Sequence, residues 1–200
     1  MWDLYRRLPG FVLGFHGCDE EHGREIIAGR KSLQPSENKY DWLGNGIYFW
    51  EASPERATQF AREAASNNKR VTRGAIKKPF VVGAVIDLGV CCNLLDSNAL
   101  NELGLAYPIF VETFKQGAET GKLPENKGKD NAARYLDRSV VEFMHALRAH
   151  QTLEPYDTVR GAFWEGGALY PGSGFSRKTH IQIAVRNPKC IKGYFLPIDS

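Results

Sequence analysis

Two short apolar segments interrupted by glycine constrain the fold of this chain more than any other feature. Residues 11–17 read FVLGFHG and residues 43–50 read LGNGIYFW, and the second segment is followed at once by EASPERATQF. Short apolar runs rich in aromatic residues and bounded by glycine predict strands, and the Ser-Pro-Glu step predicts the start of a helix. His16 and Tyr48 are therefore expected on strands, with a helix beginning near Ser53.

The rest of the chain predicts an α+β domain. Residues 53–66 form the clearest helix, with Ser53 as N-cap and apolar residues at helical spacing, and residues 20–30 predict a shorter one. Residues 79–96 are apolar on both faces, which predicts the centre of a sheet. Residues 97–151 predict a helical insertion interrupted by a polar loop at 120–130, and residues 158–198 predict strand, turn and strand.

Composition places the chain among compact globular proteins. It has 200 residues, 42% of them hydrophobic, which suits one domain spanning residues 1–200. The sequence holds no apolar run of membrane-spanning length, and its first residues lack the pattern of a signal peptide. We therefore expect a cytoplasmic protein without a membrane partner.

The cysteines predict reduced thiols and no metal site. Cys91 and Cys92 are adjacent, so on a strand they point to opposite faces, and with Cys18 and Cys190 they match no metal-ligand spacing. Small buried apolar side chains are the expected role of all four.

The charge of the chain says little about its partners. The formal net charge is +3, with one basic cluster at residues 69–78 formed by Lys69, Arg70, Arg73, Lys77 and Lys78. Such a cluster either contacts phosphates or is a solvated turn.

The order of four motifs resembles the poly(ADP-ribose) polymerase-like ADP-ribosyltransferases. FHG, LGNGIYF, GAVIDLG and THIQIAVRNPKCIKGYFL follow one another as the corresponding pieces do in that family, over about two thirds of the chain. The chain is most similar to compact bacterial members that consist of the catalytic domain alone, several of which act as toxins or phage-defence effectors. The resemblance implies split antiparallel β-sheets flanked by helices, NAD as co-substrate and no metal.

The resemblance assigns the NAD pocket to the first two motifs. His16 is implied to hydrogen-bond a ribose hydroxyl, and Gly17 to offer backbone groups to the nicotinamide carboxamide. An imidazole both donates and accepts, and glycine allows close approach to the main chain. Tyr48 is implied to stack on the nicotinamide ring, which suits a cationic pyridinium.

The helix after the second strand carries two weaker assignments. Phe60 is the candidate for the second aromatic face of the nicotinamide site, although core packing is the other interpretation. The family serine that binds the carboxamide corresponds to Ala57 or Thr58, and of these two residues Thr58 alone has a hydroxyl.

The third catalytic element departs from the family pattern. Its usual glutamate, which stabilises the charge that develops as nicotinamide leaves, is Gln182 here. Members without that glutamate transfer a single ADP-ribose unit, so mono-ADP-ribosylation is implied. Glu165 is the candidate for the missing charge if it faces the same cleft; the other interpretation is an exposed carboxylate at a strand end.

Acceptor contacts are expected on the turn YPGSGFSRK. Phe175 and Arg177 are the candidates there, and Arg160, Arg177 and Lys178 are candidates for the pyrophosphate or an acceptor phosphate. We expect a macromolecular acceptor, with RNA or DNA slightly favoured over protein. The helical insertion is either a cover for the sheet or the site of a target, an antitoxin or an inhibitor protein.

Three alternatives stay open. An NAD-dependent RNA 2′-phosphotransferase would need clustered arginines, for which Arg56, Arg62, Arg160 and Arg177 are available. A non-catalytic module that binds NAD or ADP-ribose would explain Gln182. An unrelated α+β interaction protein would match the motifs by chance.

Overall fold

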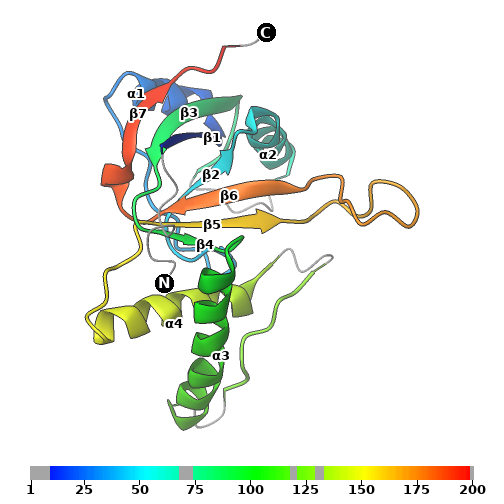
Figure 1. Cartoon of the computed structure of the whole chain (residues 1–200). Coiled ribbons are helices and arrows are strands. Elements are labelled where there is room, and N and C mark those ends of the chain that lie inside the picture. The colour runs from blue at the N-terminus through cyan, green and yellow to red at the C-terminus, as the bar shows by residue number, and fades with distance from the viewer. Residues whose placement is uncertain (1–9, 68–73, 118–120, 129–132, 199–200) are drawn as a thin grey trace.

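The fold is a seven-stranded mixed β-sheet flanked by helices. The computed structural model describes residues 10–67, 74–117, 121–128 and 133–198. The strand order is β4-β5-β6-β2-β1-β3-β7 (Figure 1). The elements, in chain order, are β1 (Phe11–Asp19), α1 (Glu20–Ile27), β2 (Ile47–Glu51), α2 (Pro54–Ser66), β3 (Pro79–Asp87), β4 (Cys91–Asn93), α3 (Ser97–Gly117), α4 (Tyr135–His150), β5 (Thr158–Phe163), β6 (His180–Val185), the 3₁₀ helix η3 (Pro188–Cys190) and β7 (Ile191–Phe195).

The sheet is continuous, but it is narrowly joined at its middle. β1 pairs with β3 from Phe11 to Asp19, whereas it pairs with β2 only at Gly14–Glu51 and Phe15–Trp50. The split sheets that the family resemblance implies are thus one sheet here, and β4 runs parallel to β5. Beyond Phe15 and Trp50 the two strands no longer pair, so the sheet opens beside His16 and Tyr48.

Side chains of alternate residues divide between the two faces of the sheet. Phe49 and Ile183 belong to one core cluster, together with Ile26 of α1. Trp50 packs on the opposite face with Ala57 of α2, and Ala184 packs on that same face with residues of α3 and α4. In Figure 1, α2 lies beside β1 and β2, while α3 and α4 lie at the β4–β5 end.

Residues 79–96 form two strands instead of the single central strand that the sequence predicts. β3 ends at Asp87 and lies next to the edge strand β7, and β4 forms the opposite edge. Gly89 separates them with a φ of +56°, a left-handed conformation that a strand cannot continue through. Cys91 and Cys92 do face opposite sides of the sheet, since each belongs to a different core cluster.

Helix α2 forms close to where the sequence predicts it. Ala57, Ala61 and Ala64 are buried along one side, and Pro54 lies in the first turn. Ser53 occupies the N-cap position, but its side chain makes no capping hydrogen bond. Packing of the alanine face therefore holds this helix more than its cap does.

The predicted helical insertion consists of α3 and α4, which pack against each other. Val140, Val141 and Met144 are the buried residues of α4, and Phe110 of α3 packs against Phe143 with ring centroids 5.5 Å apart. Part of the predicted polar loop at 120–130 lies outside the described residues. Within the described ranges, no helix is long and apolar enough to cross a bilayer.

Candidate functional site

A cavity of about 1120 Å³ lies where the sheet opens between β1 and β2. The residues that line it include His16 of β1, Tyr48 of β2, Phe60 of α2, Tyr135 of α4 and Gln182 of β6. Sites for drug-sized ligands span roughly 300–1,000 Å³. The cavity is therefore large enough for a ligand of dinucleotide size.

His16 is held in one tautomer by the neighbouring strand. Its Nδ1 lies 2.8 Å from the Tyr48 carbonyl oxygen, which can only accept, so Nδ1 carries the proton and donates. Burial lowers the pKa of His16, although this hydrogen bond opposes the shift. The neutral ring leaves Nε2 as an acceptor for a ligand hydroxyl on the cavity side.

Gly17 has a packing role that the sequence did not reveal. A Cβ built on it would lie 2.4 Å from the carbonyl oxygen of Ala57 in α2. The absence of a side chain thus lets α2 lie directly on β1. Gly17 also lines the cavity, so its backbone is within reach of a ligand.

Tyr48 and Phe60 both line the cavity but are fixed in different ways. The Tyr48 hydroxyl donates to the Gly44 carbonyl (2.8 Å) and accepts from the Leu43 N–H (3.0 Å). Burial raises the pKa of Tyr48 well above its usual value, so the phenol stays neutral. Phe60 packs on Trp50 with ring centroids 5.0 Å apart, so it belongs to the cavity wall and to a core cluster at once.

Gln182 is oriented by a tryptophan distant in sequence. Trp42 Nε1 donates to Gln182 Oε1 at 2.6 Å. The amide nitrogen has no partner among the described residues and is not enclosed by protein. Both residues line the cavity, so the site offers amide N–H donors from β6.

Glu165 faces the same cavity, where it is paired with Arg56. The Arg56 Nη2 and Glu165 Oε1 atoms form a short ion pair, and both side chains are largely buried. Arg56 Nη1 also donates to Gln59 Oε1 at 2.6 Å. The carboxylate is thus present in the cavity, but its charge is balanced by a guanidinium.

Other residues singled out from the sequence lie outside the cavity lining. Thr58 donates its hydroxyl to the Pro54 carbonyl (2.9 Å), so it is bound to its own helix. Arg160 pairs with Glu51 at 2.5 Å and Lys178 with Glu63 at 2.6 Å. Of the cations in the described chain, Lys31, Arg56 and Lys127 line the cavity in place of the pyrophosphate candidates Arg160, Arg177 and Lys178.

The acceptor candidates lie on the projecting connection between β5 and β6 (Figure 1). Phe175 is 68% exposed, and Trp164 and Tyr170 are exposed on the same connection. Backbone hydrogen bonds tie its two sides together, from Leu169 N to Phe175 O (2.8 Å) and from Arg177 N to Gly167 O (3.0 Å). It is an extension of the β5–β6 hairpin with aromatic side chains in solvent.

The basic cluster at residues 69–78 has only its last two members in the described chain. The backbone N–H groups of Lys77 and Lys78 donate to Asp19 Oδ2 at 2.8 and 3.0 Å. The Lys78 ammonium pairs with Glu20. Lys69, Arg70 and Arg73 lie outside the described residues.

Sequence reasoning missed Trp42, Trp50 and His180 as cavity residues. Trp50 and His180 are 6% and 7% exposed, and their rings lie 6.2 Å apart. His180 Nδ1 lies 2.7 Å from the Lys178 carbonyl oxygen, and burial lowers the pKa of His180 to about 4. The sequence signal that could have identified His180 is the alternation of side chains along a strand, because His180 and Gln182 are two residues apart and share one face of β6.

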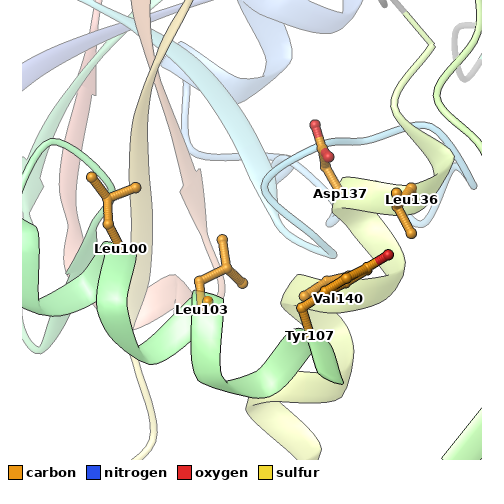
Figure 2. A pocket seen from close by; sticks show the side chains of 7 residues that line it. Leu100, Leu103, Tyr107, Leu136, Asp137 and Val140 are labelled. Carbon is orange, nitrogen blue, oxygen red and sulfur yellow. The ribbon is translucent and has the colours of Figure 1, made fainter. Parts of the chain in front are cut away.

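A second, smaller hollow lies between α3 and α4. Its volume is about 360 Å³, and Figure 2 shows side chains that line it, from Leu100, Leu103 and Tyr107 of α3 and from Leu136, Asp137 and Val140 of α4. Its lining contains one carboxylate and no cation, so it does not suit a pyrophosphate. Among the described residues, no group of three or more His, Cys, Asp or Glu side chains is arranged to hold a metal ion.

Comparison with known proteins found no matching family model, no matching curated protein and no matching solved structure.

Proposed function

We propose that this protein is a mono-ADP-ribosyltransferase that cleaves NAD, releases nicotinamide and transfers ADP-ribose to a macromolecular acceptor. One observation carries the proposal. Among the residues that the family resemblance assigns to the NAD site, His16, Gly17, Tyr48, Phe60 and Gln182 line one cavity although they come from four elements, whereas Thr58 lies outside its lining.

The polar groups of the cavity suit a ribose. Ribose hydroxyls can donate to His16 Nε2, which is an acceptor, and can accept from the Gln182 amide, which is a donor. Lys31 and Lys127 are exposed cations on the lining and are our candidates for the pyrophosphate. Tyr48 and Phe60 are the candidates for the nicotinamide ring.

In the proposed reaction, NAD supplies the bond from ribose to the nicotinamide nitrogen, which breaks with its electron pair leaving on nicotinamide. An acceptor nucleophile bonds to the ribose carbon and loses a proton. Gln182 keeps a hydrogen bond to the ribose but brings no charge. Glu165, on the same cavity lining, is our candidate for the missing carboxylate, and its ion pair with Arg56 offsets its charge.

We favour nucleic acid as the acceptor class, in a toxin or phage-defence effector. The exposed Phe175, Trp164 and Tyr170 lie on one projecting hairpin, and Arg177 is exposed beside them. Aromatic side chains stack on unpaired bases of any sequence, and arginine adds phosphate and cation–π contacts. A protein acceptor is the competing outcome.

The proposal is tested by mixing the protein with NAD labelled in its ADP-ribose half and with cell lysate. We expect free nicotinamide and label in macromolecules, both lost in Tyr48→Ala. Digestion of the products with nuclease or protease identifies the acceptor class. Arg62→Ala, an exposed change on the outer side of α2, is the matched control and should behave as the wild type.

A non-catalytic NAD-binding module is the second candidate. It is favoured by one observation, that Gln182 replaces the usual glutamate while the nearby Glu165 is neutralised by Arg56. This candidate requires NAD binding without nicotinamide release. The 2′-phosphotransferase alternative loses support, because among its four arginines Arg56 alone lines the cavity.

A further inference from the structure

The amide of Gln182 has only one chemically sensible orientation. An indole N–H donates and cannot accept, so the group that lies 2.6 Å from Trp42 Nε1 must be the amide oxygen. The amide nitrogen, with two N–H donors, is then the end left for a ligand in the cavity that both residues line.

The indole of Trp42 is itself held from several sides. Its ring lies 5.2 Å from the ring of Phe163, and the Arg134 guanidinium lies 5.0 Å above it. A Cβ at Gly161 would approach the indole to 2.7 Å, and Gly161 is the β5 partner of Gln182 in the sheet. The missing side chain on β5 therefore makes the space through which the indole reaches the amide on β6.

We propose that Trp42 is a positioning residue that holds the Gln182 amide with its N–H groups toward the cavity, so that the site selects a ligand oxygen able to accept a hydrogen bond. The inference rests on the proposed function, in which this oxygen is a ribose hydroxyl of NAD. In that role the Gln182 amide donates to the hydroxyl oxygen. With the amide reversed, Gln182 would present an acceptor, and the hydroxyl oxygen would lose its donor.

A glutamate at position 182 provides the control for the orientation of the side chain. The two oxygens of a glutamate are equivalent, so its orientation does not matter, whereas a glutamine without the Trp42 donor is free to turn over. A double-mutant cycle compares four proteins: the wild type, Trp42→Phe, Gln182→Glu and the variant that carries both changes. The measurements are NAD affinity by calorimetry and kcat/KM for nicotinamide release.

We expect Trp42→Phe to lower NAD affinity and kcat/KM by about tenfold in the wild-type background, and by less than about threefold in the Gln182→Glu background. A purely structural role of Trp42 would give the same loss in both backgrounds, and that result overturns the inference. If Trp42→Phe does not fold, benzothienylalanine at position 42 removes the N–H donor and keeps the size of the ring, and the same comparison applies.

The result separates this inference from the proposed function. NAD binding without release would reject the transferase, and the comparison of backgrounds is then made on affinity alone. Absence of both binding and release in the wild type overturns both proposals. Binding or release with equal losses in the two backgrounds overturns the role of Trp42 only.

Discussion

At the scale of single residues, the cavity contains pairs in which one residue fixes the tautomer, the orientation or the charge of another. His16 is limited to one tautomer by the Tyr48 carbonyl, and Gln182 to one orientation by Trp42. Glu165 is limited in charge by Arg56. In each pair, the partner residue fixes the tautomer, the orientation or the charge of a group that we propose meets the ligand.

The Arg56–Glu165 pair gives a prediction on stability. Glu165→Gln should lower the free energy of unfolding by about 3 kcal/mol, because it removes the carboxylate that pairs with the largely buried Arg56 guanidinium. Glu63→Gln is the matched control, since its partner Lys178 is about one-third exposed and the loss should stay below about 1 kcal/mol. Urea unfolding of both variants makes the comparison, and equal losses would contradict it.

Gln182 gives a prediction on activity. Gln182→Ala should lower the rate of nicotinamide release by about 10²-fold, the usual effect of removing one donor that stabilises a transition state. Gln116→Ala, an exposed change on α3, should leave the rate unchanged. The rate of nicotinamide release is measured by chromatography. The role of Gln182 is rejected if Gln182→Ala keeps more than half of the wild-type rate.

At the scale of elements, the position of α2 depends on glycine in β1. Helix and strand approach so closely at Gly17 that a Cβ would collide with the backbone of Ala57 rather than with a flexible side chain. The same contact brings Phe60 of α2 to the cavity wall. The packing of α2 on β1 therefore also sets the shape of the cavity.

Gly17→Ala should destabilise the protein by about 1–3 kcal/mol or more, because a backbone cannot move aside as a side chain can. Gly193→Ala in β7 is the control: a Cβ there meets nothing within 4 Å, and alanine in a strand is stabilising by roughly 0.5–1 kcal/mol. Thermal or urea unfolding measures both. A Gly17→Ala protein as stable as the control would show that α2 moves without cost.

At the scale of the whole molecule, buried histidines link stability to pH. His145 of α4 has a buried Nε2 with no partner among the described residues, and burial, with Arg186 nearby, lowers its pKa to about 4. The unfolded chain binds a proton near pH 6.5, so between pH 6.5 and 4 it holds more protons at this position than the folded protein. The contribution of a neutral His145 is complete above pH 6.5 and is lost as the pH falls toward 4.

His145→Gln should therefore reduce the loss of unfolding free energy between pH 7 and pH 4 by about 2–3 kcal/mol relative to the wild type. Urea unfolding across that range gives the two slopes. Parallel pH profiles would mean that the folded protein accepts a proton on His145 as readily as the unfolded chain does.

Much of the local structure was predictable because it depends on neighbours in sequence. The Ser-Pro-Glu start and the alanine spacing of residues 53–66 specify α2, and alternation on a strand is enough to send Cys91 and Cys92 to opposite faces. The failed prediction at residues 79–96 has a conformational cause. The pattern of apolar residues does not reveal that Gly89 adopts a left-handed backbone conformation. After Gly89 the chain forms β4, which pairs in parallel with β5 at the opposite edge of the sheet.

By itself, the sequence determined the α+β class, the strands that carry His16 and Tyr48, and the helix that carries Phe60. Only the tertiary structure decided that Trp42 reaches Gln182, that Arg56 neutralises Glu165, and that Thr58 turns to its own backbone. The physical reason is that periodicity reports which face a side chain takes, a property of a few adjacent residues. A hydrogen bond or ion pair between distant residues depends on strand order and helix placement, which are set by the packing of the whole chain.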